Sequence, residues 1–318
     1  MRIILVILIS ASLVACSSPP YCAKKPHSNW VNLPQLSADI HKLASDEFSG
    51  RKTNSAGAAL TRSYLINRFQ QIGIAPWLGT FQHEFQYSVS FANNKGVNIA
   101  GVVLAPQPTQ QWRIITAHYD HLGSKGSRIF HGADDNASGV AALLQIAQQA
   151  VAQPRLVNIL FVATDAEEAG LHGAYALVGK FKSNHTEPQI EQIELAINLD
   201  MIGRPTTRKA IYIEGTRHFE SYEQLQQSMT AINQLCIRTR QPRSFDGSVI
   251  SSPVLQASDH YPMHKAGIPW LYFGVPAHRD YHKPSDTAEK IEINFVAAVA
   301  ESAYQLLIIN SLLLKNTL

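Results

Sequence analysis

The stretch Trp-Arg-Ile-Ile-Thr-Ala-His-Tyr-Asp at residues 112–120 begins as a short apolar run and ends in an imidazole and a carboxylate. A second run, Leu-Val-Asn-Ile-Leu-Phe-Val-Ala-Thr at residues 156–164, precedes Glu167 and Glu168. Both runs are short, apolar and rich in β-branched residues, as buried strands are. Residues 138–151 between them place apolar side chains at helical spacing. Strand, helix and strand form a βαβ unit, which predicts two parallel strands in an α/β fold.

Side chains that bind metals follow these strands. His118 ends the first run, Glu168 follows the second, and Asp200 follows a third apolar run at residues 193–199. The carboxyl ends of parallel strands lie at one edge of a sheet, where open α/β folds place their sites. Imidazole with carboxylates, and no cysteine nearby, favours zinc, manganese or cobalt. Asp134, in the loop at residues 132–136, is positioned to bridge two ions.

The rest of the pattern predicts further helices and strands. Helices are expected at 37–44, 55–72, 170–181, 219–235 and 294–314. Further strands are expected at 81–87, 98–104, 210–213 and 268–273, the first two forming an antiparallel edge joined by a polar turn at 93–96. Gly73 is expected to cap the second of these helices.

The N-terminal residues have the pattern of an export signal. Arg2 precedes an apolar run too short to span a bilayer, and the run ends in Leu-Val-Ala-Cys at residues 13–16. This ending resembles the bacterial lipoprotein cleavage box, so we expect a signal peptide at 1–15, a lipidated Cys16 and a tether at 16–34. Ordinary cleavage without a lipid is the alternative. The expected location is the bacterial cell envelope, with the protein held at the outer membrane.

Composition limits the remaining choices. The chain has 318 residues, of which 45% are apolar, enough for one large core and a single domain at 35–318. The net charge of +3 is spread without a basic run, so nucleic acid is not an expected partner. Export permits a disulfide between Cys22 and Cys236, and a free thiol at Cys236 is the alternative.

Six motifs occur in order along the chain. They are His-Tyr-Asp (118–120), Gly-Ala-Asp-Asp-Asn-Ala-Ser-Gly (132–139), Ala-Glu-Glu-Ala-Gly-Leu (166–171), Asn-Leu-Asp-Met (198–201), Ser-Asp-His (258–260) and Tyr-His-Lys-Pro-Ser-Asp-Thr (281–287). Together they resemble one family, the co-catalytic di-zinc aminopeptidases of the bacterial leucyl aminopeptidase type, which has glutamate carboxypeptidase, the transferrin receptor and glutaminyl cyclase as relatives. With Phe-Ser-Gly-Arg at 48–51, the resemblance covers most of the chain. It implies a three-layer α/β/α sandwich around a central mixed, mostly parallel twisted sheet.

The resemblance also implies a ligand set for two zinc ions. His118 and Asp200 would hold one ion, and Glu168 and His282 the other. Asp134 would bridge both ions, and its bond to Asp135 would be cis.

The resemblance implies further roles near the ions. Glu167 would act as the general base, and the Asp120 carboxylate would accept the other ring N–H of His118. His278 competes with His282 as a ligand, and Asp259 and His260 would shape the pocket.

The implied activity is hydrolysis of the N-terminal peptide bond of peptides that have a free α-amine. Two alternatives keep the fold, namely a carboxypeptidase and a single-zinc glutaminyl cyclase, and a third is a binding module without catalysis. The oxyanion donor is not assigned, with Tyr281 and Tyr261 as candidates. The preferred N-terminal residue and the oligomeric state do not follow from the sequence.

Overall fold

The computed structural model describes residues 25–89, 92–183, 186–205, 209–219, 222–239, 241, 244–245, 248–249 and 254–310. Within these ranges, none of the helices combines the length and the apolar character needed to cross a membrane. The expected signal peptide, Cys16 and Cys22 all lie outside the described residues. Cys236 is disulfide-bonded.

A nine-stranded mixed sheet runs through the molecule in the order β1-β3-β7-β4-β8-β13-β9-β10, with β2 paired to β3. The four central strands are parallel to one another, whereas the β3 edge and the β13–β9 pair are antiparallel. The strands of this sheet are β1 (Ala75–Pro76), β2 (Gln82–Val89), β3 (Ala92–Val103), β4 (Trp112–His118), β7 (Asn158–Thr164), β8 (Ile193–Leu199), β9 (Ala210–Glu214), β10 (Cys236–Arg238) and β13 (Trp270–Gly274). Two short hairpins stand apart, β5 (Ser124–Lys125) with β6 (Arg128–Ile129), and β11 (Ser244–Phe245) with β12 (Ser248–Val249).

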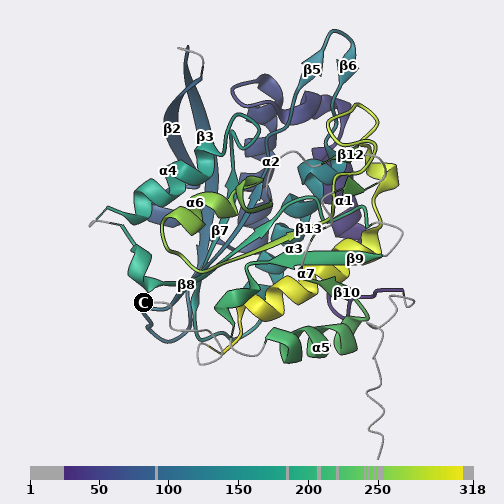
Figure 1. Cartoon of the computed structure of the whole chain (residues 1–318). Helices are drawn as coiled ribbons and strands as arrows, with labels where there is room; N and C mark the ends of the chain where they lie inside the picture. The colour runs from purple at the N-terminus through teal and green to yellow at the C-terminus, as the bar shows by residue number, and fades with distance from the viewer. Residues whose placement is uncertain are drawn as a thin grey trace, which may run out of the picture.

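Helices cover both faces of this sheet (Figure 1). The helices are α1 (Leu33–Leu43), α2 (Ala56–Ile72), α3 (Gly139–Ala152), α4 (His172–Phe181), α5 (Tyr222–Asn233), α6 (His260–Lys265) and α7 (Ile293–Leu307). Apolar residues of α1, α2, α3, α5 and α7 form one core cluster with one face of the sheet, and those of α4 and α6 form a second cluster with the other face. The protein is therefore a three-layer α/β/α sandwich, as the resemblance implied.

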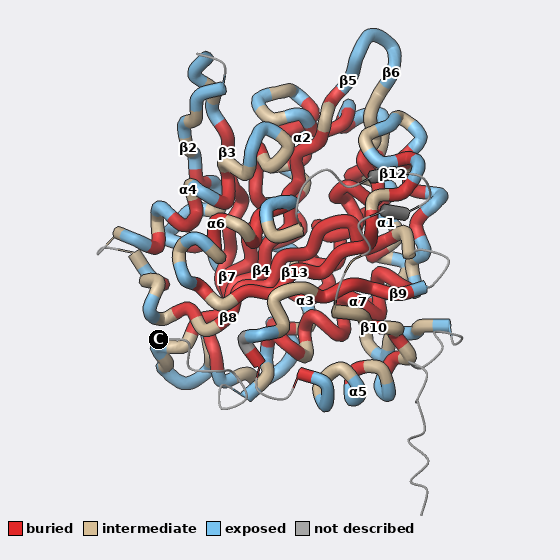
Figure 2. The backbone as a smooth tube through the Cα atoms, in the orientation of Figure 1, coloured by how far each residue is buried: buried red, intermediate tan, exposed pale blue. Residues whose placement is uncertain are grey.

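Strand β4 shows how the layers form. Ile115 and Ala117 belong to the cluster under α3 and α7, and Ile114 belongs to the cluster under α4 and α6. Successive side chains of a strand point to opposite faces, so a strand covered on both sides is apolar throughout. All seven residues of β4 are buried, and the central strands form the red interior in Figure 2. This explains the mostly apolar run that opens the motif region, in which the buried Arg113 is paired with Glu194.

The edge hairpin of β2 and β3 corrects one expectation. The polar residues 93–96 do not form a turn, because Asn93, Asn94, Lys95 and Gly96 pair with residues 85–88 of β2. Gly96 lies under the ring of Phe85, where a Cβ would clash with the ring. Cross-strand packing therefore overrides the low strand propensity of asparagine and glycine at this edge.

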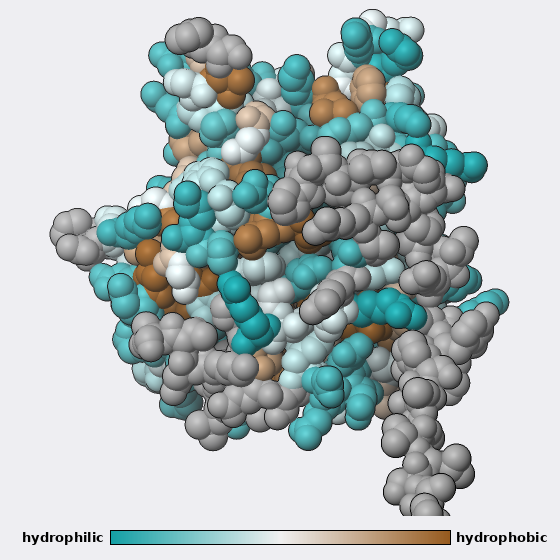
Figure 3. All heavy atoms as spheres, in the orientation of Figure 1, coloured by the Kyte–Doolittle hydropathy of each residue, from teal (hydrophilic) through white to brown (hydrophobic). Residues whose placement is uncertain are grey.

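The hairpin extends beyond the sheet at the edge where the candidate residues lie. Only Ile99–Val103 of β3 pair with β7, and Ile99 is opposite Ala163 near the carboxyl end of β7. The β2–β3 and β5–β6 hairpins project from the same side of the molecule (Figure 1). On the face drawn in Figure 3, hydrophobic residues form several separate groups among hydrophilic ones.

The segment before α1 also differs from expectation. The backbone N–H and the side-chain amide of Asn29 both donate to the carboxylate of Glu301 in α7, at 3.0 and 2.8 Å. The His27 N–H donates to the Asn233 carbonyl. The described part of the expected tether, from residue 25, is therefore attached to the domain. The buried Glu301 carboxylate gains the partner that its burial requires.

Candidate metal centre

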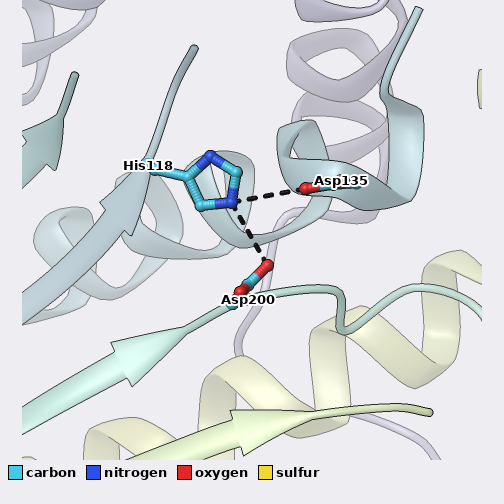
Figure 4. A group of neighbouring side chains, drawn as sticks. All are labelled: His118, Asp135 and Asp200. Carbon is cyan, nitrogen blue, oxygen red and sulfur yellow. Dashed lines mark hydrogen bonds and ion pairs between the residues drawn. The ribbon is translucent and has the colours of Figure 1, made fainter. Parts of the chain in front are cut away.

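The first part of the centre stands at the ends of two neighbouring strands. Parallel pairing places Thr116 of β4 opposite Asn198 of β8, so His118 and Asp200 emerge side by side two residues later. Nε2 of His118 lies 3.3 Å from Oδ1 of Asp200 and 3.3 Å from Oδ1 of Asp135. Figure 4 shows one ring nitrogen facing both carboxylates. The three side chains converge, with their ligand atoms within 4.8 Å of one another.

The second part consists of side chains from four segments that follow strands of the sheet or the β5–β6 hairpin. Nε2 of His282 lies 3.2 Å from Oε2 of Glu168 and 3.2 Å from Oδ2 of Asp135. Nδ1 of His121 lies 2.8 Å from Oε1 of Glu168 and 3.7 Å from Oδ2 of Asp135. His121, Asp135 and Glu168 also have ligand atoms within 4.8 Å of one another. The structure thus contains two adjacent groups of imidazole and carboxylate donors.

Asp135 is the residue shared by the two groups. Its Oδ1 faces His118 and its Oδ2 faces His282. One carboxylate with its oxygens in two ligand groups is the geometry that a bridging ligand needs. The sequence prediction that Asp134 takes this place is therefore wrong.

Asp134 points to the opposite side of the loop. Its Oδ1 accepts hydrogen bonds from the Gly203 N–H at 2.6 Å and the Ser138 hydroxyl at 3.2 Å, and its Oδ2 lies 3.1 Å from Nε2 of His278. These contacts use both oxygens of a fully buried carboxylate. His278, the competitor for the ligand position, is thus occupied by Asp134, whereas His282 reaches the centre.

Distant side chains determine the path of this loop. Oδ2 of Asp286 accepts the N–H groups of both Asp134 and Asp135, at 3.0 and 3.2 Å. The amide group of Asn136 donates to the Leu199 carbonyl and accepts from the Met201 N–H. Asp134 and Asn136 are therefore attached to the segment after β8, and Asp135 between them faces the centre. The cis peptide bond expected between Asp134 and Asp135 is instead between Asp135 and Asn136.

Arg51 connects the loop after β4 to the loop that carries Asp135. Its fully buried guanidinium donates to the carbonyls of Tyr119 at 2.8 Å, His131 at 2.7 Å and Gly132 at 2.9 Å. A further bond reaches the carbonyl of Leu43 at 2.5 Å. The planar group, with five N–H donors, satisfies carbonyls of several segments at once. It thereby ties the loop after His118 to the loop that carries Asp135.

Asp120 holds the loop that carries the glutamates, in a different way from the one expected. Its Oδ1 accepts the Glu167 N–H at 3.0 Å and its Oδ2 the Glu168 N–H at 3.3 Å. The nearest oxygen to Nδ1 of His118 is the Asp120 carbonyl at 3.1 Å, while the carboxylate lies 3.8 Å away. The main chain therefore orients the His118 ring, and the carboxylate positions Glu167 and Glu168.

The titration of the imidazoles reflects the surrounding charge. Burial alone would lower the pKa of His118, but the charges of Glu167 and Asp200 raise that pKa well above its usual value. For His282, hydrogen bonds to Asp135 and Glu168 outweigh burial and raise the pKa to about 10. The carboxylates that favour a proton on each ring nitrogen would also favour a metal ion there, so a proton and a metal ion compete for the same nitrogen. Binding of a divalent ion at these rings would therefore release protons.

Glu167 differs from Glu168. Burial raises the pKa of the Glu167 carboxyl well above its usual value, and the charge of Asp200 adds to the effect despite the opposing charge of His118. Hydrogen bonds from His121 and His282 outweigh burial at Glu168 and lower its pKa. Two adjacent carboxyl groups are thus held in different states, one anionic and one with raised proton affinity. Such separation distinguishes a ligand from an acid–base group.

The other candidate residues form the walls. The ring of Tyr281 stacks on His282 at 3.8 Å, while Tyr261 pairs with His264 at 6.4 Å. Asp259 and His260 are buried, and the His260 ring packs between Trp270 and Tyr272, each at 4.7 Å. Neither Asp259 nor His260 belongs to the two groups of ligand atoms among the described residues.

His121 is the residue that sequence reasoning missed. It comes directly after Asp120 in His-Tyr-Asp-His, so it begins the loop beyond β4 and is adjacent to two recognised candidates. A histidine at that place could have been considered a donor for the same edge of the sheet.

Comparison with known proteins agrees with the fold. Residues 98–307 match the family described as "Peptidase family M28", which is more than half of the chain. The chain therefore belongs to peptidase family M28. A stretch of 210 residues is 29% identical to "Aminopeptidase YwaD" of Bacillus subtilis (strain 168) and covers 64% of this chain but only 42% of that protein.

Two solved structures share the fold. A zinc aminopeptidase from Bacillus subtilis, BSAP, aligns over 92% of this chain and 99% of its own, with a TM-score of 0.66 and 15% identity. The glutaminyl cyclase of Fimbriiglobus ruber aligns over 92% of this chain and 100% of its own, with a TM-score of 0.69 and 17% identity. At these identities, the likeness concerns the fold alone.

Proposed function

We propose that this protein is a zinc-dependent aminopeptidase, which hydrolyses the N-terminal peptide bond of peptides. The observation that supports this proposal is the position of Asp135, one carboxylate whose two oxygens face two separate imidazoles. In this assignment His118, Asp135 and Asp200 hold one zinc ion, and Asp135, Glu168 and His282 hold the other. Family membership supports the peptidase class, and the name of the YwaD relative is consistent with the exopeptidase activity.

The donor set fits zinc. Imidazole nitrogen and carboxylate oxygen are ordinary zinc ligands. The Nδ1 atom of His118 has a carbonyl acceptor, the outer partner that zinc-binding histidines normally have. Two such ions would polarise the scissile carbonyl and lower the pKa of a shared water molecule.

Glu167 is the residue assigned to proton transfer. Its Oε2 lies 4.0 Å from Nε2 of His118, at the margin of the first group. Burial raises the pKa of this carboxyl, the direction in which a carboxylate becomes a better proton acceptor. The Asp120 carboxylate holds the N–H groups of Glu167 and Glu168 and so sets the position of both side chains.

The donor groups of the centre suit a substrate with a free amine. Asp135, Glu167, Glu168 and Asp200 meet in a space with little exposure to water. Two zinc ions would offset the charge of the carboxylates that bind them, so a free α-amine would be held through its nitrogen lone pair by an ion or by a hydrogen bond to a carboxylate. Such recognition of the end of a peptide is a property of exopeptidases.

The decisive experiment combines metal analysis with a substrate scan. Protein purified without chelator is analysed by mass spectrometry and assayed with a series of aminoacyl-nitroanilides. Two equivalents of zinc with hydrolysis that a chelator abolishes would support the proposal. One equivalent, with cyclisation of N-terminal glutamine and no hydrolysis, would replace it with the glutaminyl cyclase alternative.

The N-terminal sequence carries a second part of the proposal, that the protein is exported and anchored to a membrane through a lipid on Cys16. The Leu-Val-Ala-Cys ending at residues 13–16 supports this. Radiolabelled palmitate should enter the wild-type protein and not the Cys16→Ser variant. Equal labelling of the two proteins would contradict lipidation at this residue.

A further inference from the structure

His121 is the one member of the centre to which the proposed ligand set gives no role. Its side chain has no exposure to solvent. Nδ1 is 2.8 Å from Oε1 of Glu168, and Nε2 has no hydrogen-bond partner in the described part of the chain. This ring can either bind a metal through Nδ1 or donate the Nδ1 proton to Glu168.

His118 provides the standard for comparison. Its Nε2 faces two carboxylates, and its Nδ1 has the Asp120 carbonyl as acceptor. A histidine that binds a metal through one nitrogen carries its proton on the other, and that proton almost always has an acceptor. If Nδ1 of His121 bound a metal, the proton would be on the buried Nε2, where no acceptor is found among the described residues. Orphaned buried N–H groups are rare and costly.

We propose that His121 is a positioning residue, which donates its Nδ1 proton to Oε1 of Glu168 and directs Oε2 of that glutamate to the metal. The inference rests on the proposed function, because it assigns Glu168 to a zinc ion. With Oε1 engaged by His121, the oxygen on the side of His282, the other proposed ligand of this ion, is Oε2, which lies 3.2 Å from Nε2 of that histidine. His121 therefore makes Glu168 bind through a single oxygen.

The surroundings hold the ring in place for this role. A Cβ added to Gly132 would lie 2.6 Å from two carbon atoms of the His121 ring, so the ring packs directly on the backbone of that glycine. The Gly132 carbonyl and the Tyr119 carbonyl, two residues before His121, both accept bonds from Arg51. The ring is thus enclosed by two loops that the same guanidinium connects.

The first test compares two substitutions by metal titration. His121→Asn keeps an amide N–H close to the place of Nδ1, whereas His121→Leu keeps bulk without a donor. Loss of an outer partner of a ligand typically lowers metal affinity about 10- to 100-fold, and we expect such a loss for the leucine variant at one of two sites. The asparagine variant should retain most of the affinity. Equal losses in both variants, or no loss in either, would overturn the proposal.

His83→Leu is the matched control. His83 is also buried, and its Nε2 also lacks a partner among the described residues, but its ring packs on Trp77 and belongs to neither group of ligand atoms. The His83→Leu variant should be less stable than the wild type and should bind zinc with unchanged affinity. A loss of affinity equal to that of His121→Leu would show a general effect of removing a buried imidazole and would overturn the specific role.

The second test reads the tautomer in the wild-type protein, and a variant serves only to assign the signal. Long-range proton–nitrogen NMR spectra of zinc-loaded protein, labelled only at histidine, report the tautomer of each ring, and His121→Asn identifies the signal. The proposal requires a proton on Nδ1 of His121. A proton on Nε2 with a metal-bound Nδ1 would make His121 a ligand and overturn it.

The two proposals fail in different ways. Wild-type protein that binds no zinc and hydrolyses no aminoacyl-nitroanilide would overturn the proposed function together with this inference. Wild-type protein that binds two zinc ions and is active, with a His121→Leu variant of unchanged affinity, would overturn the role of His121 alone.

Discussion

The half of the centre around His118 consists of residues at strand ends, whereas the half around His282 consists of residues on loops. His118 and Asp200 stand at the ends of two hydrogen-bonded strands, and their side chains are 1% and 10% exposed. Glu168 and His282 stand on loops, and the His282 side chain is 36% exposed. Strands position side chains more precisely than loops do. We therefore expect the inner half, around His118, to hold its ion more firmly, and the outer half, around His282, to admit exchange and substrate.

The largest effect should come from the residue that the two halves share. Asp135→Ala removes a ligand from both groups at once, so we expect loss of both zinc ions and of hydrolysis. Asp134→Asn should keep two ions, with a stability loss of about 1–3 kcal/mol because one buried hydrogen-bond acceptor is changed. Metal analysis and denaturant unfolding measure the two outcomes.

The pair of variants also tests the assignment itself. If Asp134→Asn loses the metals and Asp135→Ala retains them, then Asp134 is the bridging residue, as the sequence suggested, and the two halves do not share Asp135.

A smaller effect is expected from the general base. Glu167→Gln removes the proton acceptor but no ligand, so we expect a fall in kcat of about 10²- to 10⁴-fold with two zinc ions still bound. Single-turnover rates and metal content are the measurements. The isosteric Glu168→Gln is the control and should lose the outer ion. Loss of metal from Glu167→Gln would instead make Glu167 a ligand.

The difference between the halves predicts the order of metal loss. On dialysis of wild-type protein against a chelator, one ion should leave before the other. His282→Ala should contain about one equivalent of zinc under conditions where the wild type retains two. Simultaneous release of both ions, or release from the His118 half first, would contradict the difference in rigidity.

The smallest effect on metal binding should come from His260, which is buried beside the centre and belongs to neither half. Its titration should instead change the stability of the fold. Burial lowers the pKa of His260 to about 3, below its value in the unfolded chain. The neutral ring therefore adds stability above about pH 6.5, and that stability is lost as the pH falls toward 3. At about 1.4 kcal/mol for each pH unit of difference, the loss is a few kcal/mol.

Urea unfolding of metal-stripped protein between pH 7 and 4 measures this loss. His260→Phe keeps an aromatic ring between Trp270 and Tyr272 and removes the titration, so its stability should fall less steeply with acid. Equal slopes for the two proteins would show that His260 does not titrate as its burial requires.

Much of this architecture was accessible from the sequence. The central strands and α3 were predicted within about two residues. A strand buried on both faces is a short, nearly continuous apolar run, and a helix packed on a sheet has apolar residues at helical spacing. The Gly73 cap was also predicted, and Gly73 has a φ of 88°. The hairpin of β2 and β3 was mistaken at residues 93–96, since polar residues at an exposed edge have no such period. His121 was missed because a single histidine has no pattern of its own.

The sequence by itself determined the order of strands and helices and the edge of the sheet where His118, Glu168 and Asp200 gather, because these follow from local periodicity and parallel pairing. Only the tertiary structure decided which of two adjacent aspartates faces the centre. Neighbouring side chains diverge, and the path of their loop depends on Asp286, which lies about 150 residues further along the chain. The role of Asp120 was likewise decided by the tertiary structure, in which its carboxylate accepts hydrogen bonds from the N–H groups of Glu167 and Glu168. Contacts between such distant segments exist only when the sheet and its helices are assembled.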